Sequence, residues 1–284
     1  QNSCKIMNKL QKQSQHTQYT QYMSKGILHK MHTQLGDTCV QYSLDLGEKN
    51  ISLNSLVQKH ITITHTGNIY CIECGCKTNK SFAQGYCYRC FTTSPHTEEC
   101  VLHPELCQAH IGIARDMEYA QNHCLIPHYV YVAETSDIKI GITRNTQIPT
   151  RWIDQGALQA CIIAQTPNRY TAGVLEVALK QKVADKTNWR KMLVKNTPEY
   201  DLRHEISVIK KYVPEYSKFL IHSEIQTLVY PGSIAFAKIQ SVKLDTKPSV
   251  SGILRAIKGQ YLIFESGEVL NIRSHGGYEV TITE

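Results

Sequence analysis

Hydrophobic and polar residues alternate along both ends of the chain, as in strands that bury one face. Between residues 26 and 70, the runs "CVQYSLDLG", "ISL" and "HITITHTGNIY" alternate in this way, with Gly47 and Gly67 at the breaks. Residues 214–284 return to the pattern in "SIAFAKIQSVKLD", "VSGILRAIKGQYLIFES" and "EVLNIRSHGGYEVTITE". The two ends therefore predict β-rich segments, 26–70 and 214–284, that pack together in a barrel-like form.

In the middle of the chain, the spacing of hydrophobic residues changes from strands alone to a mixture of strands and helices. In residues 129–213 the stretches "YVYVA" and "IKIGIT" predict two strands joined by a hairpin, and Pro149 begins a helix. Apolar residues then recur at helical spacing in "AGVLEVALKQKVAD" and in "DLRHEISVIKKYV", where Asp201 is a capping candidate. With a Cys/His-rich segment at 71–128, the whole pattern predicts an α+β fold. The Gln-rich residues 1–25 are expected to form a polar tail.

Composition and charge limit the classes of protein to which the chain can belong. The chain has 284 residues, 42% hydrophobic and 19% charged, as in globular proteins with a core. It has no run of 18 apolar residues and no apolar signal core at its start, so we expect no membrane span and a cytoplasmic location. A net charge of +7 favours nucleic acid as a partner, and a solvated basic surface is the alternative. Residues 129–213 concentrate this excess, with 13 Lys and Arg against 8 Asp and Glu.

Eleven cysteines without a signal peptide favour metal sites over disulfides. The strongest motif is "CIECGCKTNKSFAQGYCYRC", which contains the CxxC pairs Cys71–Cys74 and Cys87–Cys90. Four thiolates at about 2.3 Å satisfy zinc in a closed, tetrahedral site, as in a zinc ribbon. The motif therefore predicts a structural zinc. An iron–sulfur cluster or four free buried cysteines are the alternatives.

A second Cys/His cluster follows in "CVLHPELCQAHIGIARDMEYAQNHCLIPH". Its Cys107 and His110 have good ligand spacing, and Cys100 and Cys124 complete a Cys3His set for a second zinc. The segment holds more candidates than a zinc needs, so packing cysteines and capping histidines are the alternative for the rest. These further candidates are His103, His123 and His128.

The stretch "HYVYVAETSDIKIGITRNTQIPTRW" resembles the GIY-YIG nuclease superfamily. Tyr131 matches the tyrosine of its first half-motif, Gly141 the glycine of its second, Arg151 its catalytic arginine and Glu176 its metal-binding glutamate. Lys139 stands where the second half-motif has tyrosine, a departure that some phage-type branches resemble. The resemblance implies an α/β core over residues 129–213 and a phosphodiester-cleaving site.

In that superfamily the tyrosine assists attack, the arginine stabilises charge and the glutamate holds Mg2+ or Mn2+. The resemblance would give these roles to Tyr131, Arg151 and Glu176, with Lys139 on a phosphate. The alternative is structural: Tyr131 is a core residue, Arg151 pairs with Asp154, and Glu176 pairs with Lys180 four residues later.

The chain from about residue 26 onward also resembles the bacterial domain of unknown function 2797 family. The strings that carry this resemblance are "CIECG", "KSFAQGYCYRC", "CVLHPELC", "KIGITRNTQIPTRWIDQGA" and "ADKTNWRKML". The resemblance supplies no activity. It implies that the Cys-rich segment and the GIY-YIG-like core belong to one unit.

Basic and aromatic side chains near the predicted site are candidates for binding nucleic acid. The basic side chains would bind phosphates, and the ring of Trp189 would stack on a base. The alternative is that Thr187 caps the helix "NWRKML" and Trp189 packs inward. The candidates are Gly141, Arg144, Arg169, Lys186, Trp189, Arg190 and Lys191.

Three functions remain open on the sequence. The leading hypothesis is a zinc-stabilised protein that binds nucleic acid, DNA or RNA, with a GIY-YIG-like site and a metal-dependent endonuclease activity as its further step. The second is a non-catalytic module that binds RNA or the ribosome. The third is a scaffold for protein interactions, whose basic surface is incidental.

Overall fold

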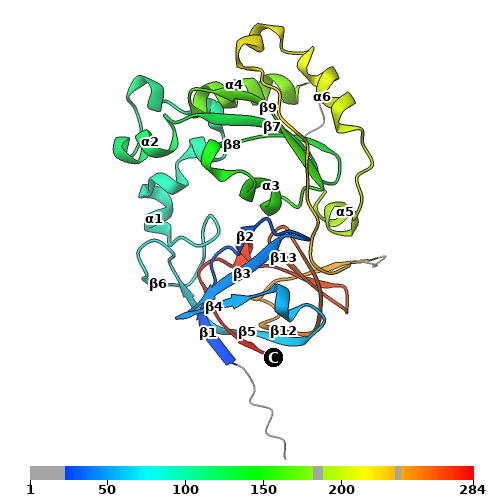
Figure 1. Cartoon of the computed structure of the whole chain (residues 1–284). Helices are drawn as coiled ribbons and strands as arrows, with labels where there is room; N and C mark the ends of the chain where they lie inside the picture. The colour runs from blue at the N-terminus through cyan, green and yellow to red at the C-terminus, as the bar shows by residue number, and fades with distance from the viewer. Residues whose placement is uncertain (1–22, 182–187, 234–237) are drawn as a thin grey trace, which may run out of the picture.

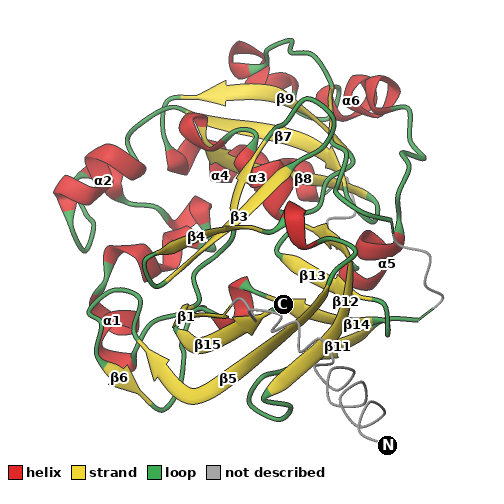
Figure 2. Cartoon of the chain, turned by 60° about the horizontal axis from the view of Figure 1, so that its bottom comes forward, coloured by secondary structure: helices red, strands yellow, loops and turns green. Residues whose placement is uncertain are grey.

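The computed structural model describes residues 23–181, 188–233 and 238–284. Its strands form a large sheet, an α/β layer and a small sheet (Figures 1 and 2). The large sheet follows the order β1 (Met23–Ile27), β15 (Tyr278–Thr283), β5 (His60–Tyr70), β12 (Ser249–Lys258), β13 (Tyr261–Phe264), β14 (Glu268–Asn271) and β11 (Gln240–Val242), with β6 (Lys77–Thr78) beside β5. The α/β layer has the order β10 (Gln226–Thr227), β9 (Gln159–Thr166), β7 (His128–Glu134) and β8 (Ile138–Arg144), and the small sheet has β2 (His32–Gln34), β3 (Gln41–Leu46) and β4 (Lys49–Ser52).

The large sheet joins the two ends of the chain. β5 lies between β12 and β15 and pairs antiparallel with both, so that Ile63 faces Val250 on one side and Ile282 on the other. Alternation along β5 buries Ile61 and Ile63 completely, as the sequence pattern indicates. In the described residues this sheet is an open path from β1 to β11, so the expected barrel-like form is wrong. The α+β class is confirmed.

The α/β layer sits on the large sheet through α3. The helices are α1 (Tyr88–Thr93), α2 (Met117–His123), α3 (Thr150–Asp154), α4 (Arg169–Lys180), α5 (Trp189–Val194) and α6 (Leu202–Lys210). Trp152 and Ile153 of α3 are buried in the same apolar core as the large and small sheets. A second core lies between β7–β9 and the apolar faces of α4 and α6, with Leu175 and Ile209 buried in it. Figure 1 shows the Cys-rich segment with α1 and α2 (cyan) along one side of both layers.

Two local expectations have clear outcomes. Asp201 caps α6, and its carboxylate accepts hydrogen bonds from the backbone N–H groups of Arg203 and His204, as predicted.

The polar tail is expected to extend to residue 25, but β1 begins at Met23 and pairs with β15, so the last three residues of the expected tail belong to the sheet. No helix in the described ranges has the length and apolar character needed to cross a membrane.

A buried ionic network fastens β7 to the segment after α5. Glu134 is fully buried, and its carboxylate lies 2.7 Å from the ammonium of Lys195. The same carboxylate accepts hydrogen bonds from the Gln159 amide at 2.6 Å and from the Glu199 backbone N–H at 2.7 Å. Lys195 pairs with Glu199 as well, at 3.1 Å. Burial raises the pKa of Glu134, but the contacts with Lys195, Glu199 and Gln159 together outweigh it, so that the pKa is lowered.

Loss of Glu134 should therefore be costly. Glu134→Ala leaves the ammonium of Lys195 buried without its main partner, and we expect the free energy of unfolding to fall by about 3–5 kcal/mol in urea titrations. Glu199→Ala is the matched control, because it removes a partner of the same lysine whose side chain is 58% exposed, and it should cost under about 1 kcal/mol. Equal effects of the two variants would contradict the assignment of the network to the buried carboxylate.

Candidate functional site

One cleft of about 590 Å3 lies between the α/β layer, the Cys-rich segment and the large sheet. β8 lines it with Lys139, Gly141 and Arg144, α3 with Arg151, and α4 with Arg169, Glu176 and Lys180. The Cys-rich segment contributes Tyr86, His96 and Tyr119, and the β-rich ends contribute Lys30 and Arg273. Side chains that lie far apart in the sequence thus meet at one opening.

Tyr131 lies beneath the floor of this cleft. It is fully buried on β7 directly opposite Gly141 of β8. A Cβ on Gly141 would lie only 2.4 Å from the Tyr131 hydroxyl, so glycine is what lets the ring pass under β8. The hydroxyl donates to the amide oxygen of Gln155 at 2.8 Å, and Gln155 itself lines the cleft. Burial raises the pKa of Tyr131, and the nearby guanidinium of Arg151 opposes that rise.

Arg151 and Glu176 both reach the cleft from helices. The Nε of Arg151 is buried and has no hydrogen-bond partner in the described part of the chain. Glu176 is 7% exposed and pairs with Lys180 at 3.1 Å, so the predicted structural pairing of these two residues is present inside the cleft. Asp154 pairs with Lys30 at 3.1 Å.

Basic groups crowd the cleft. In the described part of the chain, seven lysine and arginine side chains line it, against the two carboxylates of Asp154 and Glu176. The pKa of Arg144 is lowered, mainly by burial and further by the charge of Arg169. The pKa of Arg273 is lowered in the same way, by burial and then by the charge of Arg151. An anion in the cleft would relieve this repulsion between like charges.

Three further nucleic-acid candidates, Trp189, Arg190 and Lys191, are not among the residues that line this cleft. Trp189 of α5 is half-buried, stacks on Tyr261 with ring centroids 5.8 Å apart, and carries the guanidinium of Arg190 on its ring. Lys191 pairs with Asp137 at 2.8 Å. Together with Tyr261 and Arg273, Trp189 lines a neighbouring hollow of about 260 Å3, which shares Lys139 and Gln155 with the cleft.

Two candidates of this region fall beyond the described ranges. Lys186 lies outside the described residues, and so does Thr187, the predicted cap of α5. The cap of that helix is Asn188, whose side chain accepts hydrogen bonds from the backbone N–H groups of Arg190 and Lys191.

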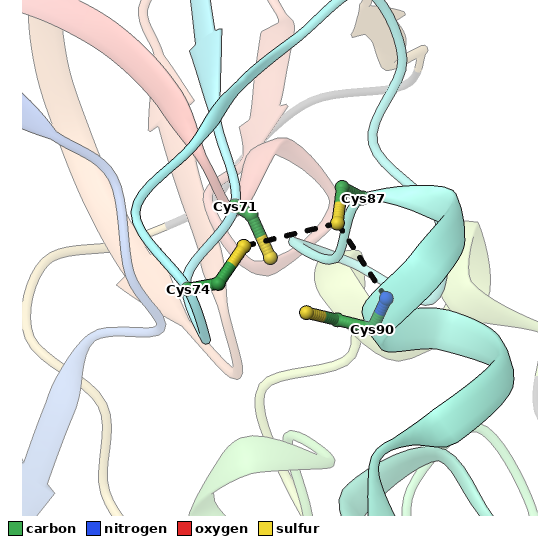
Figure 3. Close-up of side chains that lie close together, drawn as sticks. All are labelled: Cys71, Cys74, Cys87 and Cys90. Atoms are coloured by element: carbon green, nitrogen blue, oxygen red, sulfur yellow. Dashed lines mark hydrogen bonds between the residues drawn. The ribbon is translucent and has the colours of Figure 1, made fainter.

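The first cysteine motif forms a compact four-thiol centre (Figure 3). The sulfur atoms of Cys71, Cys74, Cys87 and Cys90 all lie within 4.8 Å of one another. Cys74 and Cys87 are 3.9 Å apart, close to the separation of about 3.8 Å that sulfur atoms 2.3 Å from a tetrahedral ion would have. The Cys87 sulfur also accepts the Cys90 backbone N–H at the start of α1. This group could hold a metal ion.

The second cysteine group contains three thiols. The sulfur atoms of Cys100, Cys107 and Cys124 lie within 4.8 Å of one another and are buried. Hydrogen bonds from Cys100 and then Cys124 lower the pKa of Cys107 to about 3, which favours the thiolate that metals bind. His110 was predicted as the fourth ligand but is not in this group.

His110 is exposed and stacks on Tyr170, with ring centroids 4.1 Å apart. The three thiols contact Arg169 instead: the Nη1 of Arg169 lies 3.2 Å from the Cys100 sulfur. Ligand spacing along the sequence placed His110 near Cys107, but it could not show that the ring turns outward.

Sequence reasoning missed the contributions of the chain's ends to the cleft. Lys30 precedes β2, and Arg273 follows β14, in segments that the sequence assigned only to β-rich packing. Arg273 donates to the amide oxygen of Gln84 at 2.7 Å, which ties it to the Cys-rich segment. No local motif marks either residue, because their position depends on the way the large sheet packs beneath the α/β layer.

The comparisons identify a family. The sequence profile of a family described as "Protein of unknown function (DUF2797)" matches residues 58–280. No curated protein and no solved structure matches the chain.

Gly141 gives a direct test of the floor of the cleft. Gly141→Ala forces the ring of Tyr131 or strand β8 to move, and we expect this overpacking to lower the free energy of unfolding by about 1–3 kcal/mol in urea titrations. Tyr131→Phe is the control, since it keeps the ring and removes the bond to Gln155, at a cost of about 1 kcal/mol. An alanine variant as stable as the wild type would show that the ring does not lie under Gly141.

Proposed function

The chain belongs to the DUF2797 family, and from that premise we propose that its cleft binds the phosphate backbone of nucleic acid. The observation that carries this proposal is that seven basic side chains and two carboxylates of the described residues line the cleft. Phosphates spaced along a strand neutralise several cations at once and release counterions as they bind. The guanidinium of Arg151, which lines the cleft, would offer one such phosphate a charged donor.

We propose that bound zinc stabilises the Cys-rich segment, which forms one side of the cleft. We propose a structural zinc at Cys71, Cys74, Cys87 and Cys90, because four thiolates at this spacing suit zinc and fill its coordination sphere. A second zinc at Cys100, Cys107 and Cys124 is favoured by their three buried sulfur atoms, which lie within 4.8 Å of one another. The segment between these cysteines has little apolar core of its own, so zinc would supply much of its folding free energy.

Cleavage of the bound strand is the second candidate function. It is favoured by the meeting of Lys139, Arg151 and Glu176 in one cleft above Tyr131, in the order that resembles a GIY-YIG site. Arg151 would stabilise charge on the phosphate, Lys139 would hold it, and Tyr131 would act through Gln155, to which its hydroxyl is bonded.

A divalent cation would be part of that second function. Mg2+ is commonly bound through one or two carboxylates together with waters and phosphate oxygens, and Glu176 offers one carboxylate. Such an ion would polarise the phosphate and activate a water. Glu176 also forms an ion pair with Lys180, and the metal ion would have to displace the Lys180 ammonium from the carboxylate. The scaffold interpretation is less favoured, because the cleft is open and polar rather than filled by core side chains.

Binding should be salt-sensitive and should depend on the cleft. We expect a labelled oligonucleotide to bind at low salt, with log affinity falling against log salt in anisotropy titrations. The double variant Arg144→Ala, Arg273→Ala should weaken binding to all sequences alike and reduce that slope by about 2. Arg203→Ala, an exposed arginine of α6 outside the cleft, should change neither. Absence of binding at low salt would overturn the proposal.

The cysteine groups should hold zinc in measurable amounts. Elemental analysis of the purified protein should give about two zinc ions per chain, and Cys90→Ser should lose about one of them together with much of the thermal stability. Cys76→Ser is the matched control: this exposed thiol lies 3.2 Å from the Cys74 sulfur but outside the four-thiol group, and it should keep the metal. A folded and stable protein without metal would contradict the assignment.

The cleavage candidate has its own test. With Mg2+ or Mn2+ the wild type should cut labelled DNA or RNA, and Glu176→Gln should abolish the cutting without loss of zinc. Arg151→Ala should slow it roughly 10²- to 10³-fold. Glu224→Gln, an exposed carboxylate outside the cleft, should cut normally. If the wild type binds but cuts no substrate, the protein is a binding module only.

A further inference from the structure

The cleft has two unlike walls. The wall from β8, α3 and α4 is basic, with Lys139, Arg144 and Arg151 among its side chains. A second wall comes from the Cys-rich segment and presents rings and apolar groups to the same space. Its members are Tyr86, His96, Val101, Leu102, Pro104 and Tyr119.

Two rings of the second wall, His96 and Tyr119, are packed against each other. Tyr119 stacks face to face on His123, with centroids 3.8 Å apart and planes 9° apart. His96 meets Tyr119 edge to face at 4.7 Å, and His96 is exposed. Leu102, on the same wall, is 83% exposed. An apolar side chain and aromatic rings on the wall of a polar cleft favour a ligand with flat, apolar faces.

The two walls meet at Tyr119. Tyr119, Arg144 and Arg169 line the same cleft, and the two guanidinium charges oppose the rise that burial causes in the pKa of the Tyr119 phenol. A ligand that places a phosphate on Arg144 would therefore bring its next group within reach of Tyr119 and His96.

We propose that the ligand of this cleft is single-stranded nucleic acid, whose unpaired bases stack on the Tyr119–His96 wall while its phosphates lie on the basic wall. The inference rests on the proposed binding of phosphate backbone and names the form of nucleic acid that is bound. In a duplex the bases are paired inside the helix and present no faces, so a duplex offers its phosphates to the basic wall and nothing to the rings. A single strand offers both, because each base carries a face that an aromatic ring can stack on.

The ligand itself provides the first test, with the full-length protein. Anisotropy titrations at one salt concentration compare a short labelled DNA strand, the same strand with abasic sites at its central positions, and its duplex. We expect the intact strand to bind about tenfold or more tighter than either of the others, the scale of one or two stacked bases. Equal affinity for all three would overturn the inference and leave backbone binding standing. Binding of none would overturn backbone binding itself.

Variants separate the rings from the charges. Tyr119→Leu should weaken binding of the intact strand roughly 10- to 100-fold. The affinities for the abasic strand and the duplex should stay within about twofold of the wild-type values. His96→Ala, at an exposed position, should act in the same direction with less risk to folding, and zinc content and melting temperature report whether each variant is intact. Tyr88→Leu is the control, because this ring is 65% exposed on α1 outside the cleft. Equal weakening of all three ligands by both variants would overturn the proposal.

Discussion

The close approach of α4 to the Cys-rich segment is the contact on which the cleft depends. A Cβ on Gly173 would lie 2.3 Å from the backbone nitrogen of Glu105, so the helix and the neighbouring turn meet backbone to backbone. Arg169, one turn earlier, fastens the same contact: its backbone N–H donates to Cys124, its Nη1 to the Cys100 sulfur and its Nη2 to the His123 carbonyl. A glycine inside a helix costs about 1 kcal/mol, which this approach explains. This contact brings the Tyr119–His96 wall to the same cleft as the basic wall.

Charge is handled differently in the interior and in the cleft. Glu134 and Lys195 are buried as a satisfied pair, with every carboxylate oxygen bonded. In the cleft, Arg144 and Arg273 lie near other guanidinium groups, and burial and that repulsion lower the pKa of each. A fold gains nothing from such crowding, because like charges in a partly desolvated space repel strongly. The crowding is consistent with the proposed binding of an anion, and Cys100 of the second cysteine group lines the same cleft.

Much of the fold could be predicted, because alternation and helical spacing are local. The alternation in "HITITHTGNIY" corresponds to β5, and Asp201 begins α6 as expected. The barrel-like form was wrong, because alternation shows which face of a strand is buried but not whether the edges of its sheet close. Similarly, the tail was placed three residues too far, since the pairing of β1 with β15 involves partners about 255 residues apart that no local window contains.

The sequence by itself determined the chemistry that is written in short spacings: two CxxC pairs that form one four-thiol group, and the family to which the chain belongs. It also predicted Lys139, Arg151 and Glu176 as members of one site, and these residues line one cleft. The tertiary structure alone decided that Tyr131 lies beneath Gly141, that His110 turns away from the three thiols, and that Lys30 and Arg273 arrive from the two ends of the chain. The reason is physical: ligand spacing acts over a few bonds, whereas the walls of a cleft are set by how buried faces pack, and those faces come from segments that the sequence keeps apart.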